Sequence, residues 1–440
     1  MIPKNDILEA LKNIIDPDLH QDIVSLGFIK NLSIHDTHVQ LDIELTTPAC
    51  PVKSEFQQKA EDLIKNIPGV KSVTVQMTSQ PVKRSVAAQN LSSGLNDVKS
   101  IIAVSSCKGG VGKSTMAAAL AKELSQRGFK VGLLDADIYG PSMPSLFNAY
   151  QISIHTNEKQ QIIPSEIGKL KVMSFGFLLG DSPAVMRGPI VSRYIQQLLH
   201  QTDWGKLDYL FIDMPPGTGD VQLTITQNVN LSGAIIVTTR QTLSLVDVAR
   251  GILMFETVKV PMLGIIENMS HFICDGCGKK HFIFGAHGED LLKDRFGLET
   301  LAQIPILPAL SSKFDQEIHI LEIQNAVDQV VRAIGKMSRT QNLVPKYMFD
   351  AQNLTLEWPD GKIFVVSNRA LRLSCRCALC VNELTGEKIL REDRIQNDIM
   401  PKEIMTLGNY ALGIKWNDGH SSGIYPYASI EKLAGKSVNS

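Results

Sequence analysis

The sequence predicts an α/β protein with a central, mainly parallel, doubly wound sheet, a small α+β domain before it and a strand-rich domain after it. Two observations carry this prediction. Between residues 98 and 337, short apolar strands alternate with longer amphipathic helices, the order expected of a parallel sheet covered on both faces. After residue 345, Asp-Gly turns follow apolar strands, which is typical of antiparallel hairpins.

Composition narrows the class of protein. The 440 residues are enough for two or three domains, and 44% hydrophobic with 20% charged residues is an ordinary globular balance. The net charge is -1 and no Lys/Arg block is present, so we expect no nucleic-acid partner. No apolar run reaches the roughly 20 residues that cross a bilayer, so we expect no membrane contact. The first ten residues resemble neither a signal nor a transit peptide, which favours a bacterial cytoplasmic protein.

The first domain, residues 1–80, is expected to mix helices and strands. Apolar residues recur at helical spacing at Ile7, Leu8, Leu11, Ile14 and Ile15, and a second helix is expected after Pro51. Val39–Leu45 and Val70–Met77 are predicted strands. The polar stretch from residue 79 to 96 is predicted to be a linker.

The middle domain, residues 98–337, carries the strand–helix alternation. The predicted strands are Ser100–Ser105, Lys130–Asp135, Leu170–Phe175, Tyr209–Asp213, Ala234–Thr238, Met262–Glu267 and Thr300–Ile304. The predicted helices are Ser114–Arg127, Pro189–His200, Ser244–Val258 and a segment that ends before Lys336.

The third domain, residues 346–436, follows a second predicted linker, Ser338–Pro345. Leu356–Gly361 and Ile414–Gly419 each place Asp-Gly after an apolar strand that contains Trp. They predict two hairpins that are structurally equivalent. The alternative is a coincidence between two common turns.

A phosphate-binding loop is predicted where a strand, a Gly-rich turn and a helix follow one another at residues 104–115. The glycines let the backbone approach phosphate, and successive N–H groups form an anion cradle. Lys113 is expected to reach the β- and γ-phosphates, and Ser114 to ligate Mg²⁺. Cys107 stands where the usual pattern has its first Gly, which ordinary backbone dihedrals would permit. The predicted ATP-binding residues here are Cys107, Lys108, Gly109, Gly110, Val111, Gly112, Lys113, Ser114 and Thr115.

Acidic residues end two of the predicted strands. Asp135 and Asp137 close one strand and Asp213 closes another, at the sheet edge where open α/β sheets bind ligands. A carboxylate there suits a magnesium shell. Gly217 and Gly219 then suggest a switch that senses the γ-phosphate. The alternative for each acid alone is a solvated strand end.

Seven cysteines, five of them in two tight clusters, suggest metal or redox chemistry in a reducing compartment. The spacing of Cys274 and Cys277 lets both sulfurs face one metal centre. Half a zinc knuckle with His281 as third ligand, and a redox pair, remain open. Two thiols cannot complete a four-thiolate cluster, but two chains related by a two-fold axis can, so a homodimer is expected.

The remaining cysteines are weaker candidates. Cys50 precedes Pro51 at a predicted helix start, where the helix dipole favours a reactive or cluster-contacting thiolate. The alternative is a small apolar residue packed under that helix. Cys375, Cys377 and Cys380 suggest a metal site whose fourth ligand is missing from the pattern. The alternative is a reduced thiol group on a strand and turn.

The motifs of the middle domain resemble the Mrp/ApbC family of iron–sulfur carrier ATPases, whose P-loop is of the deviant MinD-like type. The matching phrases are Cys107–Thr115, Asp135–Ser142, Met186–Pro189, Asp213–Asp220, Glu267–Ser270 and Cys274–Cys277. The family turn often has Pro after its first cysteine, where this chain has Asp275.

The resemblance implies an ATPase that uses Mg²⁺ and a bridging [4Fe–4S] cluster, which it transfers to apoproteins. It makes Lys108, Lys113 and Asp137 catalytic, with Lys108 reaching the partner's nucleotide and Asp137 orienting water. It assigns Ser114, Asp135 and Asp213 to the magnesium site. It also assigns Asn268 to ATP binding, and Cys274 and Cys277 to the cluster.

The flanking domains narrow the resemblance. Asp16–Asp18, Asp22–Val24 and Leu45–Pro51 look like a MIP18-type domain. Leu371–Cys380 and Trp416–Gly419 look like a DUF971-type domain. The order of the three domains is similar to the high-chlorophyll-fluorescence group of plant plastid Mrp-like proteins, which serve [4Fe–4S] assembly.

Two other classes of function compete. A MinD/ParA-like positioning ATPase needs a membrane-binding helix or a basic DNA face, and the tail from Ala428 to Ser440 offers neither. A zinc-stabilised regulatory NTPase would use the same cysteine turn for a structural metal.

Overall fold

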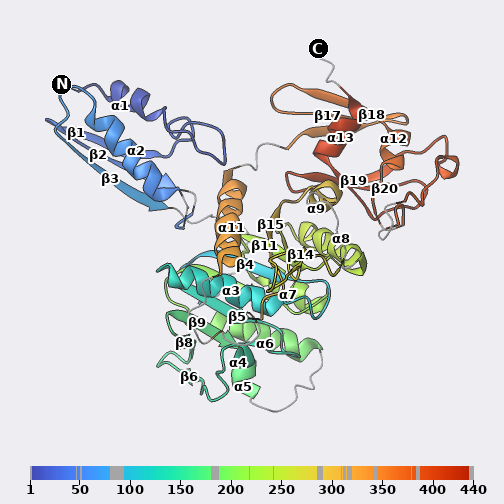
Figure 1. Ribbon diagram of the computed structural model, residues 1–440, viewed down its shortest axis with the longest axis horizontal. Helices are drawn as coiled ribbons and strands as arrows, with labels where there is room; N and C mark the ends of the chain where they lie inside the picture. The colour runs from blue at the N-terminus through green and yellow to red at the C-terminus, as the bar shows by residue number, and fades with distance from the viewer. Residues whose placement is uncertain are drawn as a thin grey trace. The chain divides into compact units, whose positions relative to one another are not determined.

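The computed structural model describes residues 2–435 except for residues 46, 50–51, 80–93, 180–187, 218, 241, 285–290, 309, 311–313, 315–319, 340–343, 378 and 383–386. The chain divides into two compact units, whose elements are labelled in Figure 1. One unit contains Met1–Ser85 and Val327–Arg339, and the other contains Val86–Ala326 and Thr340–Ser440.

The first unit is a small α+β fold. Its elements are α1 (Lys4–Leu11), β1 (Ile29–His35), β2 (His38–Leu45), α2 (Lys53–Lys65) and β3 (Ser72–Ser79). Strand β2 is central, antiparallel to β1 and parallel to β3. Alternate residues of β2 are buried, so one face of the sheet forms the core with α1 and α2. The end of α11 belongs to this unit, where Arg332 donates to both carboxylate oxygens of Asp18 at 2.9 and 3.1 Å.

The second unit is organised by an eight-stranded sheet in the order β15-β12-β11-β4-β10-β5-β9-β8. All neighbours are parallel except β8 and β9. The strands are β4 (Val98–Ser105), β5 (Val131–Asp135), β8 (Ser165–Ile167), β9 (Leu170–Ser174), β10 (Leu207–Asp213), β11 (Gly233–Thr238), β12 (Met262–Glu267) and β15 (Thr300–Gln303). The predicted strands and their parallel arrangement are confirmed, and the short antiparallel β8 was not predicted.

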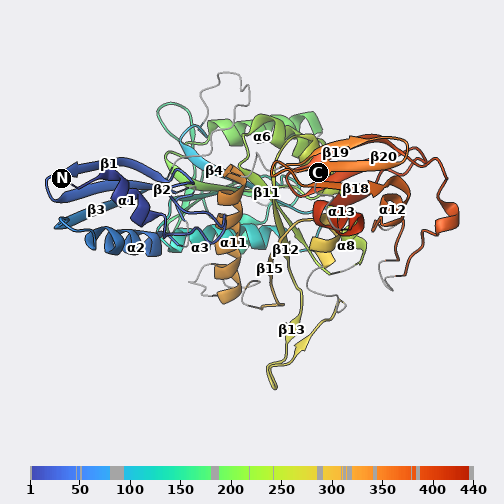
Figure 2. The same cartoon turned by 90° about the horizontal axis from the view of Figure 1, so that it is seen from above.

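Helices cover both faces of this sheet, with α3 and α6 on opposite sides in Figure 2. The helices are α3 (Lys113–Gln126), α4 (Met143–Leu146), α5 (Gly176–Leu179), α6 (Gly188–Gln201), α7 (Asp220–Asn228), α8 (Thr242–Thr257), α9 (Leu291–Phe296) and α11 (Leu321–Arg339). Two small hairpins are β6 (His155–Thr156) with β7 (Ile162–Ile163), and β13 (Phe272–Ile273) with β14 (Lys280–His281). The doubly wound fold is therefore confirmed.

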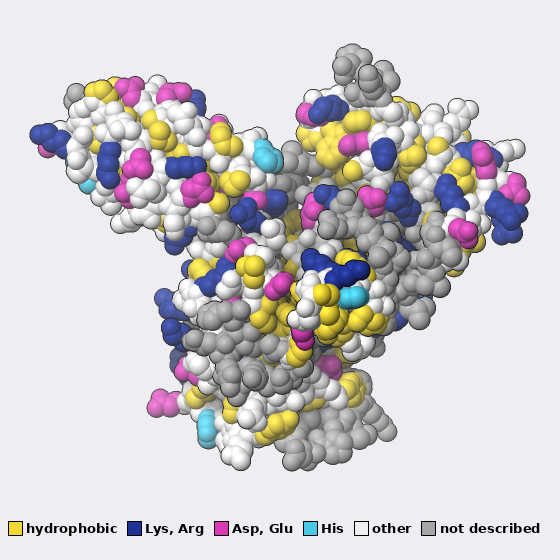
Figure 3. Space-filling model, viewed as in Figure 1, with side chains coloured by type: hydrophobic (Ala, Val, Ile, Leu, Met, Phe, Trp, Pro, Cys, Tyr) yellow, Lys and Arg dark blue, Asp and Glu magenta, His cyan; other side chains and the backbone are white. Residues whose placement is uncertain are grey.

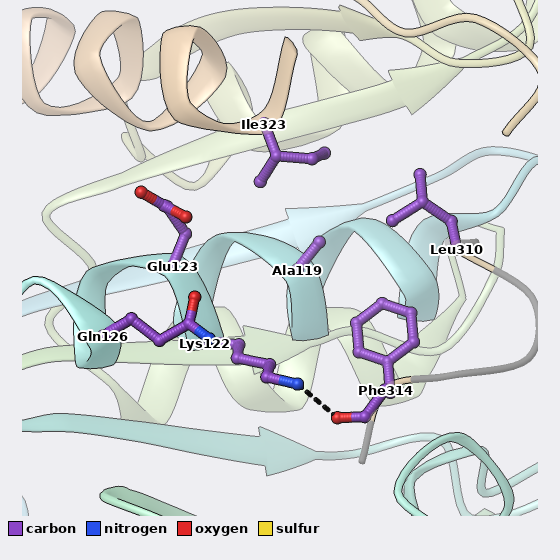
Figure 4. A pocket seen from close by; sticks show the side chains of 7 residues that line it. All are labelled: Ala119, Lys122, Glu123, Gln126, Leu310, Phe314 and Ile323. Atoms are coloured by element: carbon purple, nitrogen blue, oxygen red, sulfur yellow. Dashed lines mark hydrogen bonds between the residues drawn. The ribbon is translucent and has the colours of Figure 1, made fainter. Parts of the chain in front are cut away.

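The first turn of α11 lies beside α3. A small pocket there is lined by Ala119, Lys122, Glu123, Gln126, Leu310, Phe314 and Ile323, and Lys122 donates to the carbonyl of Phe314 (Figure 4). Helix α11 continues to Arg339, so the predicted linker start at Ser338 is wrong. Val327, Val330 and Ile334 are buried along one face of this helix.

The C-terminal part consists of two three-stranded antiparallel sheets. The elements are β16 (Lys346–Phe349), β17 (Asn353–Glu357), β18 (Ile363–Ser367), α12 (Asn368–Leu373), η2 (Glu392–Arg394), β19 (Pro401–Leu407), β20 (Ala411–Trp416), β21 (Gly423–Pro426) and α13 (Tyr427–Ala434). Both predicted hairpins are confirmed, as β17–β18 and β20–β21. They are equivalent, because each supplies the second and third strands of its sheet. No helix in the described parts of the chain is long and apolar enough to cross a membrane.

Candidate functional site

The Gly-rich loop connects the central strand β4 to helix α3. Gly110 and Gly112 have φ values of 78° and 84°, which a side chain would strain. A Cβ on Gly112 would also lie 2.2 Å from the side-chain nitrogen of Asn268. The loop therefore has to keep glycine at residue 112 to sit against the end of β12.

Lys113 lies in a buried polar group at the start of α3. Its ammonium group donates to the Asp213 carboxylate and lies 3.2 Å from the Ser114 hydroxyl. The Lys113 side chain is only 7% exposed and that of Asp213 is fully buried. The fold thus brings together three of the residues that the sequence assigned to phosphate and magnesium.

Two acids meet because β10 and β5 are parallel neighbours in register. Asp213 pairs with Asp135 at the carboxyl ends of these strands. Burial raises the pKa of Asp135 to about 7, and the negative charge of Asp213 adds to this shift. Burial likewise raises the pKa of Asp213, against the opposing effect of Lys113.

The two acids have different surroundings. Asp135 accepts hydrogen bonds from the Ser174 hydroxyl and from the backbone N–H groups of Asp137, Ser142 and Met143, so it fixes the segment after β5. Oδ2 of Asp213 is buried and has no hydrogen-bond partner within the described residues. A buried carboxylate oxygen without a partner suits a cation or its water shell.

Residues beside this centre come from two loops. Oδ1 of Asp137 accepts from the backbone N–H of Gly140 at 3.2 Å. Gly217, with φ 95°, donates its N–H to the carbonyl of Ser106 at 3.0 Å, which ties the predicted switch segment to the P-loop. Thr218 lies outside the described residues, so the switch segment is only partly described.

Cys107 and Lys108 face helix α8. Burial raises the pKa of the Cys107 thiol to about 12, which disfavours its thiolate. The φ of Cys107 is not positive, so this position does not require the glycine of the usual pattern. Its sulfur fills the space beside Gly251, where a Cβ would approach it to 2.5 Å. The ammonium group of Lys108 lies 4.0 Å from the carboxylate of Asp247.

A buried turn at residues 267–270 adjoins the P-loop. The side chain of Asn268 donates to the carbonyl of Val111 at 2.9 Å. Both Glu267 carboxylate oxygens accept from Arg240, one of them at 3.2 Å. Arg240 was missed by sequence reasoning, because a lone arginine after a strand carries no motif.

The cysteine turn lies between β13 and β14, on a hairpin that Figure 2 shows projecting beyond the sheet. Cys274 is half-buried and Cys277 is exposed. The backbone N–H groups of Cys277 and Gly276 lower the pKa of the Cys274 thiol, which favours the thiolate. His281 lies on β14 and is exposed, and no group of three candidate ligands in the described chain contains it.

The C-terminal cysteine group contains four candidate metal ligands. Cys375, Cys377 and Cys380 lie with His420, and all four ligand atoms are within 4.8 Å of one another. Nε2 of His420 is 3.3 Å from Sγ of Cys375 and 3.5 Å from Sγ of Cys377. The expectation that a fourth ligand is missing is therefore wrong, because the β20–β21 hairpin carries His420 to the cysteines.

Charge in this group is distributed among the ligands and Arg372. Burial opposes protonation of His420, but hydrogen bonds to the cysteines raise its pKa to about 9. Hydrogen bonds from the other thiols lower the pKa of Cys377. Arg372 donates to Sγ of Cys380 at 3.4 Å and to the carboxylate of Asp418 at 2.8 Å. Cys50 lies outside the described residues, so its predicted role stays a prediction.

Three family models match the chain. Residues 97–340 match the NUBPL iron-transfer P-loop NTPase model, residues 4–77 an iron–sulfur cluster assembly protein model, and residues 346–431 the N-terminal part of gamma-butyrobetaine hydroxylase-like proteins.

Curated relatives match most of the chain. The chain is 43% identical to the chloroplastic Fe–S cluster assembly factor HCF101 of Arabidopsis thaliana, over 98% of this chain and 82% of that protein. It is 39% identical to the iron–sulfur cluster carrier protein of Synechocystis, over 76% of this chain and 97% of the relative. A solved nucleotide-binding protein of Archaeoglobus fulgidus in complex with ADP is 38% identical, covers 53% of this chain and 89% of its own, and has a TM-score of 0.45.

Proposed function

The chain belongs to the iron-transfer P-loop NTPase family, and we propose that it is an ATP-dependent carrier of a [4Fe–4S] cluster, which it delivers to apoproteins. One observation carries the proposal. A P-loop and a pair of cysteines, Cys277 exposed and Cys274 half-buried with a lowered thiol pKa, lie on the same sheet-based unit. This arrangement suits a nucleotide-controlled ligand set for a soft metal cargo.

The residues around Lys113 fit Mg²⁺ and ATP. The unpartnered Oδ2 of Asp213 and the Ser114 hydroxyl are oxygen donors of the kind that Mg²⁺ binds. These residues would hold Mg²⁺, which would supply positive charge against the charge that develops on the transferred phosphoryl group. Lys113 contributes a positive charge for the β- and γ-phosphates, and Asp137 orients the attacking water. Asn268 and the loop residues hold the nucleotide.

The cargo site implies a homodimer. A cubane cluster commonly takes four thiolates, and the turn of one chain offers two, Cys274 and Cys277. A two-fold axis that brings two turns together supplies four. Lys108, which reaches Asp247 within the chain, then turns to the partner's nucleotide. A Lys108→Ala protein should keep ATP binding but lose hydrolysis, and wild-type turnover would remove this argument.

The exposure of the cysteine turn suits transfer of a cluster to another protein. Cys277 is exposed and Cys274 is half-buried, so thiolates of an acceptor protein can approach the cluster and replace these ligands one at a time. The expected recipients are apo iron–sulfur proteins. Reduced thiols are required throughout, which favours the cytoplasm as the place of action.

A second metal site is supported by the C-terminal cysteines. We infer that Cys375, Cys377, Cys380 and His420 hold one zinc ion, because three thiolates and an imidazole form a common closed structural zinc site. Cys375 and Cys380 lie in the hydrophobic core of the C-terminal sheets and Cys377 packs against it, so an ion bound there would stabilise the fold.

Anaerobic reconstitution with iron and sulfide tests the carrier proposal. The full chain should gain visible absorption and about four irons per dimer at the hairpin, by the count of thiolates above. Cys274→Ala should lose both and shift toward monomer. Asp275→Asn, in the same turn, is the matched control and should retain both.

The competing classes give different results. Zinc bound at the hairpin with iron refused, and equal dimerisation without Cys274, would favour a zinc-stabilised regulatory NTPase. ATP-dependent dimerisation with no metal at the hairpin would favour a positioning ATPase.

A further inference from the structure

The base of the cysteine hairpin is attached to the turn that borders the P-loop. The guanidinium group of Arg240, which follows β11, lies over the ring of Phe282, with 4.8 Å between Cζ and the ring centroid. Phe282 directly follows β14 and lies five residues after Cys277. An arginine stacked on an aromatic face is a directional contact that holds the hairpin strand in place.

Arg240 also contacts the end of β12, from which the chain leads to the hairpin. It bonds both carboxylate oxygens of Glu267, the last residue of β12. The next residue, Asn268, donates to the Val111 carbonyl in the P-loop. Two side-chain contacts, Arg240 with Glu267 and Arg240 with Phe282, therefore link the nucleotide-loop turn to the hairpin.

The first strand of the hairpin, β13, is held beside the same contact. His271, next to β13, accepts a backbone hydrogen bond from Ile306 at 2.8 Å, and its ring lies 5.8 Å from the ring of Phe282. Between Asn268 and Ser270, Met269 has a φ of 51°, an uncommon conformation for a side chain of this size. A small change at Asn268 therefore has one short, tightly packed route to both strands.

We propose that Arg240 is a positioning residue that couples the nucleotide site to the cysteine hairpin through its stack on Phe282. This proposal rests on the carrier function, and it deepens that function by naming how nucleotide controls the thiols. When nucleotide contacts change the bond between Asn268 and Val111, the turn at residues 267–270 moves, and Arg240 carries the movement through Phe282 to β14, which follows the turn that bears Cys277.

The burial of Arg240 and Phe282 suits this coupling between the nucleotide site and the hairpin. Arg240 is 6% exposed and Phe282 is 39% exposed, so the contact spans the boundary between core and surface. Figure 3 shows hydrophobic, basic and histidine side chains together where Figure 1 labels β14. Ile283, the next residue, is 60% exposed and offers a control that alters the same surface without the stack.

The test measures the alkylation rate of Cys277 by iodoacetamide in cluster-free full-length protein, with and without Mg²⁺ and a non-hydrolysable ATP analogue. Mass spectrometry of the Cys277 peptide gives the rate. In wild type the analogue should change this rate by about fivefold or more, the lower end of common couplings between sites. In Phe282→Leu the ratio should fall close to one while the analogue still binds.

Arg240→Lys keeps a positive charge for Glu267 but loses the planar stack, and it should behave as Phe282→Leu does. Ile283→Ala should respond as wild type does. A wild-type ratio of one, a full response in Phe282→Leu, or a lost response in Ile283→Ala would each overturn the proposal. The assay needs no cluster, so a failed reconstitution would overturn the carrier function without changing this result.

Discussion

The hairpin turn holds Cys277 exposed and Cys274 half-buried, whereas Cys375 and Cys380 are buried in the core of the C-terminal sheets, with Cys377 and the half-buried His420 beside them. The first site offers two thiols from one chain, and the second brings four ligand atoms within 4.8 Å of one another. Under the proposed function, the first site is open and is completed by a partner chain, while the second is closed, with four candidate ligands in one chain. On this account, the number of ligands in one chain and their burial, rather than the number of cysteines, separate a cargo site from a structural one.

The largest expected effect comes from the nucleotide site and should reach only one of the two metal sites, the cysteine hairpin. Lys113→Ala removes the charge expected at the β- and γ-phosphates, so ATP hydrolysis should fall by roughly 10²-fold or more. Any effect of ATP on the hairpin cargo should disappear, while the metal content at Cys375 stays unchanged. Turnover assays and metal analysis of the same preparation check this. Retained hydrolysis would contradict the assignment of Lys113.

The next effect concerns the closed site. His420→Ala removes one of the four ligands, so zinc affinity should fall by more than the roughly 100-fold that loss of an outer partner costs. Competition with a colorimetric chelator measures the affinity. Iron loading at Cys274 should be unaffected. If His420→Ala bound zinc as wild type does, the four-ligand site would be wrong.

A smaller effect should come from the outer partner of the closed site. Arg372→Gln removes the charged donor to Cys380 and the bond to Asp418, so zinc affinity should fall roughly 10- to 100-fold. Arg369 lies on the same helix α12 and donates to the backbone carbonyls of residues 392 and 395. Arg369→Gln therefore serves as the control. Equal affinities in both variants would show that Arg372 does not tune the site.

The smallest effect concerns the link between the two regions. Tyr410, whose pKa burial raises well above its usual value, donates to Glu256 on α8 at 2.8 Å. Tyr410→Phe loses that bond, while the Gly408 N–H still donates to Glu256, so the free energy of unfolding should fall by about 1–2 kcal/mol. Denaturant unfolding measures the change. No loss of stability would mean that this contact does not hold the C-terminal sheets to α8.

Sequence patterns predicted the sheet and the nucleotide loop because both depend on local order. Apolar strands that alternate with helices specify a parallel sheet, and adjacent parallel strands then bring Asp135 and Asp213 into register. The two Asp-Gly hairpins were predicted for the same reason, since a tight turn is encoded in a few neighbouring residues.

Contacts between segments that are distant in the sequence could not be predicted from local patterns. His420 lies forty residues after Cys380, and the predicted hairpin gave no sign that its turn would fold back onto the cysteines. Arg240 meets Phe282 only because β11 and β12 are neighbours in the sheet. Helix α11 runs past its predicted end to Arg339, and the local pattern does not mark that residue as a stop.

The most direct test of the contrast follows both metals in one sample. The full chain is loaded anaerobically with iron, sulfide and zinc, mixed with an excess of an apo iron–sulfur protein, separated, and analysed for metals. Iron should leave with the acceptor from wild type, while about one zinc per chain remains, as the single four-ligand site requires. Iron that stays on the chain, or zinc that leaves with it, would contradict the division into an open cargo site and a closed structural site.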